Sequence, residues 1–455
     1  METLIIIIFI LGYLAITLEH NLKLDKLIPA LGMMAILWAI VAFGIDNFTN
    51  WFDSAAHALI DGFAGFTSEE KHHLLEETLL HHLGKTAEIL FFLLGAMTIV
   101  EIIDYFDGFA TFKNYIKTKN KRRLLWIFAA LAFILSAIID NLTATIVLIT
   151  ILQKIIGDKE TRLWFAGLIV IAANAGGAWS PIGDVTTTML WIGKKVTTEK
   201  LIEYLIIPSL LCVIVPVAIA SFMKPFQGEL EITENDDNGG PASKYGPTML
   251  YLGLSAIIFV PIFKTITHLP PYVGMMLSLA VVGVFAEIYS RTQFSISKAI
   301  DDDGDDSHGF HSPVHKSLSK IEMPSVLFFF GILMAVAALE SLGMLFIGAE
   351  HLKVLIPNTD VVIMLLGVGS AVVDNVPLVA ASMGMFQEPI DDHIWHFIAY
   401  SAGTGGSMLI IGSAAGVVAM GMEKINFFWY FKNIAWLAAV GFVIGAISFM
   451  FIRQF

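Results

Sequence analysis

The chain has 455 residues, of which 56% are hydrophobic and only 15% are charged, and its mean hydropathy is +0.75. Soluble domains carry about 25% charged residues, so this composition excludes an ordinary soluble domain. The formal net charge of −13 argues against nucleic acid as a partner. Apolar stretches of about 20 residues recur along the chain, which predicts an all-α polytopic protein embedded in a lipid bilayer.

Ten stretches are long and apolar enough to be transmembrane spans. The first lacks a basic segment before its apolar run and lacks a convincing cleavage site, so we expect a retained span rather than a signal peptide. The single cysteine, Cys212, permits no intrachain disulfide. The spans are expected at 2–18, 27–44, 87–104, 163–193, 201–223, 247–268, 269–290, 321–342, 393–423 and 427–453.

Three polar stretches, 45–86, 224–246 and 291–320, are expected to be loops. Within the first, EEKHHLLEETLLHH at 69–82 predicts a separate amphipathic helix on the membrane surface. Histidines spaced at i and i+8 on one face leave zinc binding or pH sensing as an alternative for this helix, because histidine titrates near neutrality.

Two further apolar runs, 124–156 and 361–387, carry an ionisable pair at the centre. SAIIDN at 136–141 in the first returns as SAVVDN at 370–375 in the second. Chance resemblance between apolar segments does not readily explain a repeated Asp-Asn. Two looser echoes follow the same order: FFLLGAM with FFFGILM (91–97 and 328–334), and AGGAWSPIGD with AGTGGSMLIIGS (175–184 and 402–413).

These echoes predict an internal duplication, with residues 1–223 as the first repeat and 247–455 as the second. Residues 224–246, rich in Gly, Asn and Asp, are expected to form the linker between the repeats. Each repeat would hold five spans and one re-entrant hairpin.

The basic segment KNYIKTKNKRR at 113–123 predicts a cytoplasmic loop. The run that follows, 124–156, would measure roughly 50 Å as one helix, against a hydrocarbon core of about 30 Å. Its far end is also basic, so we expect it to turn near Asp140 and return to the cytoplasmic side. Inverted topology then requires the hairpin at 361–387 to enter from outside and places both termini outside. Tilted or broken helices are the alternative.

Charged groups inside the membrane are functional candidates by default, because an aspartate at the bilayer centre costs roughly 2.5–3.5 kcal/mol. The fourth span contains NAGGAWSPIGD at 174–184, whose glycines and proline cannot propagate a regular helix, and it ends on a third carboxylate, Asp184. Inverted repeats build transporter sites where such broken helices meet near the midplane. The alternative is that the glycines serve only close helix packing.

SAIIDNLTATIVL, NAGGAWSPIGDVTTTML, SAVVDNVP and SAGTGGSMLIIGSAAG closely resemble the signature regions of NhaD-type sodium/proton antiporters, and the resemblance covers essentially the whole chain. These antiporters belong to a superfamily with divalent-anion symporters and arsenite permeases. The resemblance implies ten spans with two hairpins, a homodimer, a bacterial inner membrane and elevator-like alternating access. Pro377 stands where the first copy has Thr143, so the two cation shells are expected to differ.

Exchange requires that a proton and a cation compete for the same oxygen atoms. The sequence therefore assigns exchange of Na⁺, and also Li⁺, for H⁺ to a site of carboxylates with supporting amides and hydroxyls, all of them hard ligands. The cation and proton site is predicted at Asp140, Asn141, Thr143, Asp184, Asp374, Asn375, Ser370 and Thr404, with Na⁺ held by Asp140, Asn141, Asp184, Asp374 and Asn375.

An anion transporter of the same superfamily, for arsenite or a dicarboxylate, is the alternative function. It would require cationic groups or paired Ser-Asn-Thr anion-binding groups near the hairpin tips, and no Arg or Lys occurs there. An intramembrane metallohydrolase would require His and Glu at metal-ligand spacing inside a span, and the one such cluster falls outside the spans. No nucleotide-binding loop of the G-x-x-x-x-G-K-[ST] type occurs, so we expect secondary transport with no cofactor beyond the transported ion, and no enzymatic activity.

Overall fold

The computed structural model describes residues 1–17, 19–53, 58–115, 118–230, 245–298, 312–372 and 375–454. In this part of the chain nearly all regular structure is helical, and nine helices are long and apolar enough to cross a membrane. The prediction of an all-α polytopic membrane protein is confirmed. One short antiparallel pair, β1 (Phe52–Asp53) with β2 (Ala58–Leu59), is the only sheet in the described residues.

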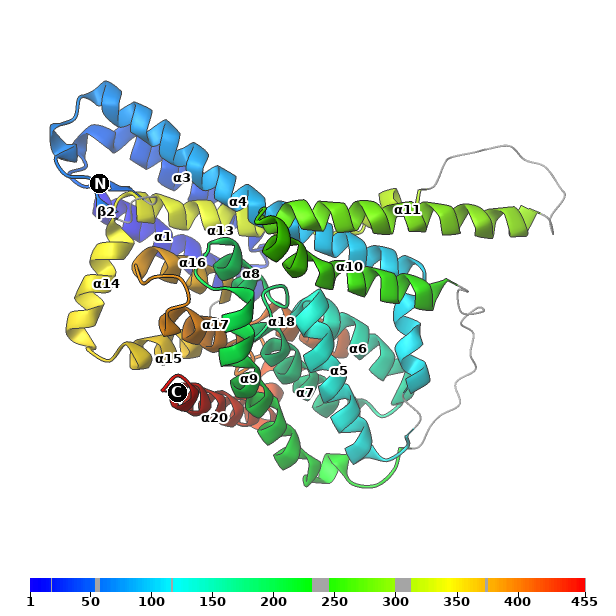
Figure 1. Ribbon diagram of the computed structural model, residues 1–455. Coiled ribbons are helices and arrows are strands. Elements are labelled where there is room, and N and C mark those ends of the chain that lie inside the picture. The colour runs from blue at the N-terminus through cyan, green and yellow to red at the C-terminus, as the bar shows by residue number, and fades with distance from the viewer. Residues whose placement is uncertain are drawn as a thin grey trace.

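The α-helices follow one another along the whole chain (Figure 1). They are α1 (Glu2–Thr17), α2 (Glu19–Leu22), α3 (Leu27–Gly44), α4 (Ser68–Tyr105), α5 (Lys121–Ile139), α6 (Asn141–Ile155), α7 (Lys159–Ala178), α8 (Val185–Ile192), α9 (Thr198–Ser221), α10 (Gly246–Thr267), α11 (Pro271–Lys298), α12 (Pro313–Leu318), α13 (Met323–Ser341), α14 (Met344–Leu355), α15 (Thr359–Gly369), α16 (Asn375–Met385), α17 (His393–Gly405), α18 (Ala414–Glu423), α19 (Phe427–Asn433) and α20 (Ala435–Ile452). Short 3₁₀ helices are η1 (Ile45–Asn47), η2 (Phe63–Gly65), η3 (Gly108–Tyr115) and η4 (Lys224–Phe226).

Six helices form one layer, drawn along the upper part of Figure 1. In this layer α3 packs against α1 and α13, and α11 packs against α10 and α4. We call α1, α3, α4, α10, α11 and α13 the outer group. Many of its apolar side chains are exposed, as expected for helices that face lipid.

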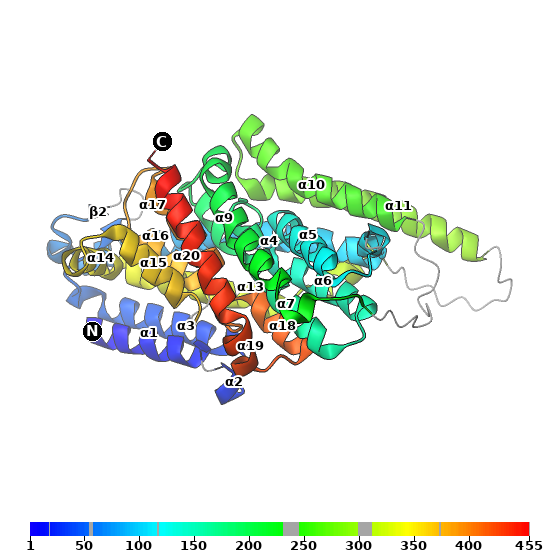
Figure 2. The same ribbon diagram turned by 90° about the horizontal axis from the view of Figure 1, so that it is seen from below.

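The remaining long helices gather around α7 and α17, which contact each other. Helix α7 packs against α5, α6, α9 and α18, while α17 packs against α15, α16, α8 and α20. Figure 2 shows α20 running beside α9, and these two helices pack closely on each other. Small residues permit the close packing. A Cβ atom on Gly176 would overlap the main chain at Phe133, and one on Gly405 would overlap the main chain at Gly367.

The run 124–156 is divided at Asp140 into α5 and α6, which pack on each other as a hairpin. The start of α5, and the first turns of α7 that follow α6, both contact the loop at residues 226–228. Lys121, at the start of α5, donates its amide to the Gly228 carbonyl, and the same loop reaches α7, where the Phe226 and Trp164 rings are 6.3 Å apart. The run 361–387 is likewise divided into α15 and α16, which both pack on α17.

Two boundary predictions are wrong. The stretch 291–320 is not a loop throughout, because α11 continues to Lys298 and α12 occupies Pro313–Leu318. Residues 69–82 do not form a separate surface helix within a loop, because α4 continues through them for 38 residues. A capping box at Thr67 and Glu70 starts the helix. Its first turns then pack on the protein. His82 is buried, and Thr86 donates to the Met334 sulfur on α13. The described residues include no cluster of three metal-ligating side chains on this helix.

The two predicted repeats and their boundaries stay predictions. The order of elements is compatible with them, since each half contains a hairpin followed by a broken helix (α7–α8 and α17–α18) and a long final helix. Residues 231–244, most of the predicted linker, lie outside the described residues.

Candidate ion-binding site

Asp140 forms the turn between α5 and α6. Its backbone angles are φ 82° and ψ 160°, a region that is essentially reserved for glycine. The side chain compensates by capping α6. Oδ1 accepts from the Thr143 amide and Oδ2 accepts from the Thr143 hydroxyl, both at 2.9 Å. A non-glycine residue in this conformation is strained, and strain of this kind is concentrated at functional sites.

Asp184 begins α8 at the second break. Pro181 and Gly183 end the regular helix after Ala178, and the Asp184 side chain then accepts from the Thr186 amide at 3.2 Å. A Cβ atom on Gly183 would lie 2.7 Å from the Ser136 carbonyl oxygen, so glycine is needed where this loop passes α5. Asp184 is only 3% exposed. The break therefore places a buried carboxylate within the second group of helices, at the start of α8.

Both hairpin asparagines reach this carboxylate. The Nδ2 group of Asn141 donates to Asp184 Oδ2 at 3.1 Å, and the Nδ2 group of Asn375 donates to the same oxygen at 3.2 Å. Asn141 is the first residue of α6 and Asn375 is the first residue of α16. The two copies of the repeated phrase thus converge on one oxygen atom.

Two further members of this network are absent from the sequence prediction. Asn174 on α7 accepts from Asn141 Nδ2 at 3.0 Å and donates to Ser413 Oγ at 2.9 Å. Ser413 caps α18 as Asp184 caps α8. The signals for both were present. Asn174 is the single amide in IAANAGGA, and Ser413 ends the echo that pairs it with Asp184.

Ser370 and Thr404 are buried close to the breaks, and each hydroxyl group donates a hydrogen bond to the main chain. Ser370 donates to the Ala402 carbonyl on α17 at 2.8 Å, and Thr404 donates to the Tyr400 carbonyl at 2.6 Å. Ser136, in the first copy of the phrase, donates the equivalent hydrogen bond to the Ala173 carbonyl. What the two predicted ligands can offer a cation is an oxygen lone pair.

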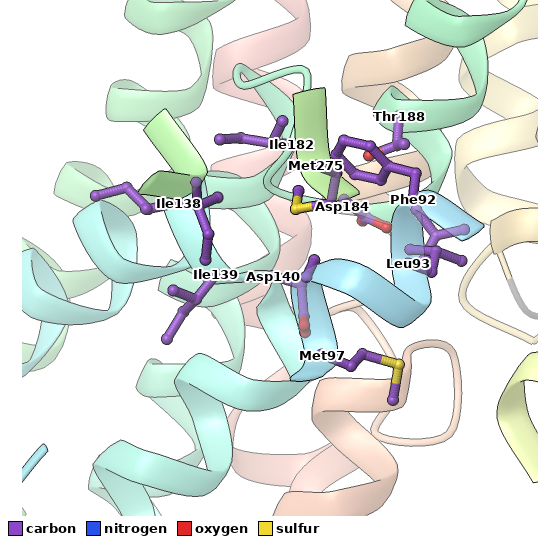
Figure 3. Close-up of a pocket in the computed structure, with 13 residues that line it drawn as sticks. Phe92, Leu93, Met97, Ile138, Ile139, Asp140, Ile182, Asp184, Thr188 and Met275 are labelled. Atoms are coloured by element: carbon purple, nitrogen blue, oxygen red, sulfur yellow. The ribbon is translucent and has the colours of Figure 1, made fainter. Parts of the chain in front are cut away.

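Asp140 and Asp184 line one pocket (Figure 3). The rest of its lining is mostly apolar. Part of it belongs to α5 and α8, and the facing wall comes from α4, α10 and α11 of the outer group, with Phe92, Ile257 and Met275 among its residues. The pocket therefore lies between the two groups of helices, with both carboxylates on the α5–α8 side. Asp374, the third predicted carboxylate, lies outside the described residues.

The assembled groups are carboxylate, amide and hydroxyl oxygens, which are hard ligands suited to a small alkali cation. A cation at Asp184 would displace the amide protons now directed at Oδ2, and rotation of either asparagine amide would present its oxygen instead. A carboxylate binds a cation only in its deprotonated form, so protons and cations exclude each other there.

Comparison with known proteins shows the family to which the chain belongs. A family model described as "Citrate transporter" matches residues 5–397. The chain is 36% identical to Sodium/proton antiporter 2 of Arabidopsis thaliana, with 99% of both chains covered. It is 38% identical to Sodium/proton antiporter 1 of the same plant, over 98% of this chain and 72% of that one.

A bacterial relative, the Na(+)/H(+) antiporter NhaD of Vibrio cholerae, is 32% identical over 99% of this chain and 91% of its own length. Matches of this length include every helix that builds the pocket and the network around Asp184. The chain belongs to the family of NhaD-type sodium/proton antiporters, a family of multi-pass membrane transporters and not of enzymes.

Proposed function

We propose that this protein exchanges Na⁺ for H⁺ across its membrane, with the cation bound at Asp184 and Asp140. The observation that carries the proposal is the convergence of Asn141 and Asn375 on Asp184 Oδ2. Both halves of the protein donate hydrogen bonds to this buried carboxylate. An ion bound there would compete with those hydrogen bonds and would therefore affect how the two halves pack. The names of the relatives support Na⁺ and H⁺ as the ions. No cofactor beyond the transported cation is part of the proposal.

Li⁺ is included as a second transported cation. It is a small, hard alkali ion that the same oxygen atoms would bind. Asp374, Ser370 and Thr404 remain proposed as further ligands, with Asp374 following Val373 directly before Asn375 in the second copy of the phrase.

Elevator-like alternating access is the proposed mechanism. Its support is the location of the pocket between two groups of helices, because a relative displacement of these groups would carry Asp184 past the walls from α4, α10 and α11. Inverted repeats would make the two end states similar in energy. We further propose a homodimer in a lipid bilayer. The bacterial inner membrane stays a prediction, since the relatives come from both bacteria and a plant.

A second candidate is anion transport, favoured by the description of the matching family model as a citrate transporter. The groups that meet at Asp184 argue against it, because a carboxylate with amide and hydroxyl neighbours would repel a polycarboxylate unless a cation were bound first. Anion transport would therefore depend on Na⁺.

The test uses purified protein in vesicles with an imposed pH gradient. Addition of Na⁺ or Li⁺ is expected to dissipate the gradient, while K⁺ has a much smaller effect. The experiment is repeated with citrate present and absent at constant Na⁺. If dissipation requires citrate, or if labelled citrate is taken up, the protein is an anion transporter and the proposed antiport is wrong.

A further inference from the structure

Lys264 is a charged residue within α10, an apolar helix of the outer group. Its ammonium Nζ lies 3.0 Å from the Trp191 carbonyl oxygen and 4.1 Å from the centre of the Trp191 ring. Lysines in the last turn of a membrane helix commonly extend to the lipid–water interface, whereas the Lys264 ammonium group contacts α8 instead. The ion-binding network around Asp184 does not use this charge.

The partner of Lys264 is the last turn of α8. Carbonyl groups at a helix C-terminus carry a partial negative charge, and an ammonium is favourable there. The face of the Trp191 ring adds a cation–π attraction. Because Asp184 caps the opposite end of the same eight-residue helix, α8 bears the ion-binding carboxylate at its start and the contact to α10 at its end.

The two residues lie just beyond the pocket lining, on the two helices that contribute Thr188 and Ile257 to it. Ile257 lines the pocket from α10, and Lys264 follows seven residues later on the same helix face. Thr188 lines the pocket from α8, and Trp191 follows three residues later. The Trp191 ring packs edge-on against Phe92, with the ring centres 6.2 Å apart, and Phe92 itself lines the pocket (Figure 3).

We propose that the contact between Lys264 and Trp191 is a latch that closes the pocket at this end and holds α8 against α10. The inference rests on the proposed alternating access, in which α8 moves relative to the outer group. The latch stabilises the closed arrangement described here, and it must break before an ion passes at this end. Lys264 thereby acts through the position of α8 and is a positioning residue, not a ligand.

The test measures access to the pocket and needs no transport. A single cysteine at Ile257, in a Cys212→Ser background, is labelled with a membrane-impermeant thiol reagent added to one side of the membrane. A cysteine at His268, which ends α10, identifies the side to which the latch belongs. Lys264→Met removes both interactions, whereas Lys264→Arg retains a donor and a cation over the ring. Lys200→Met is the matched control, because Lys200 binds Glu203 at 2.7 Å and lies over the Tyr204 ring.

Lys264→Met is expected to raise the labelling rate from the His268 side about tenfold, the change that ~1.4 kcal/mol of lost latch energy produces. Lys264→Arg and Lys200→Met should stay near the parent rate. Unchanged labelling in Lys264→Met, or an equal rise from both sides or in Lys200→Met, would overturn the latch. If Lys264→Met does not fold, Trp191→Leu, which removes the ring contact and keeps the main-chain carbonyl, must give a smaller rise from the same side. Labelling proceeds whether or not Na⁺ is exchanged, so failure of the latch is distinguishable from failure of the proposed antiport.

Discussion

Asn375 donates its side-chain amide to Asp184 across 3.2 Å, although the two residues are 191 positions apart in the chain. Asn141 binds the same oxygen from the other hairpin. The site is therefore complete only when both broken regions are packed together, and a change that separates them should impair ion binding before it unfolds the protein.

Asp140→Asn should abolish or severely reduce exchange while the protein still folds. Asparagine caps helices about as well as aspartate, so the amide oxygen retains the bond from the Thr143 amide and the free energy of unfolding should change by less than ~1 kcal/mol. Asp140→Glu should be nearly as damaging, because one methylene moves the ligand by more than the ~0.5 Å that a preorganised site tolerates. Na⁺-driven proton flux and thermal unfolding in detergent measure the two effects. Wild-type flux in the Asn variant would show that Asp140 is only a helix cap.

Gly176→Ala should destabilise the protein by about 1–3 kcal/mol, because the added methyl group overlaps the Phe133 main chain, which has no room to yield. Gly84→Ala is the matched control. Gly84 lies inside α4 with nothing within 4 Å of an added Cβ, so alanine there should be neutral or stabilising by about 1 kcal/mol. Thermal unfolding of the two variants in the same detergent makes the comparison. Equal stability would mean that α7 and α5 approach less closely than described.

The ion pair between Arg162 and Glu423 joins the start of α7 to the end of α18. Arg162 Nε lies 3.0 Å from Glu423 Oε2, the Glu423 side chain is 1% exposed, and Arg162 also donates to the carbonyls of Ile156 and Gly157. Arg162→Met alone should cost about 3–5 kcal/mol because it leaves a buried charge unpaired. The double variant Arg162→Met, Glu423→Leu should recover much of that loss. A double variant less stable than either single change would contradict this account.

Single cysteines at Lys119 and Lys159, in a Cys212→Ser background, should both react with an impermeant reagent only from the cytoplasmic side. Lys119 lies directly before α5, and its carbonyl accepts from the Leu230 amide at 2.8 Å. Lys159 begins α7 after the hairpin. Reaction from opposite sides would mean that 124–156 crosses the membrane fully.

The breaks were predictable because their residues interrupt the hydropathy pattern locally. Asp140 and Asp184 are charged residues in apolar runs, and Pro181 and Gly183 cannot continue a regular helix. Each break is therefore visible in the sequence. The continuation of α4 through 69–82 is not predictable from its residues, because their polar character is equally typical of a separate surface helix. Burial of His82 against the rest of the protein depends on tertiary packing that periodicity does not record.

The network around Asp184 was predictable only in part. Asn141 and Asn375 belong to the repeated phrase, so repetition identified them. Asn174 and Ser413 stand outside that phrase, and their weaker sequence signals do not show that they meet. Their role comes from a hydrogen bond between residues 239 positions apart, which exists only because α7 packs on α18. Sequence patterns indicate which groups are unusual, but not which of them meet.

Asp184→Asn tests most directly the claim that Asp184 binds the exchanged ions. It keeps the shape of the α8 cap and removes only the ionisable oxygen that accepts hydrogen bonds from both asparagines. The measurement is dissipation of a pH gradient on addition of Na⁺ to vesicles that contain equal amounts of folded variant or wild-type protein. We predict that the variant dissipates the gradient at less than about a tenth of the wild-type rate, a change equivalent to at least ~1.4 kcal/mol of activation free energy. Dissipation by the variant at the wild-type rate and at the same Na⁺ concentration would contradict this claim.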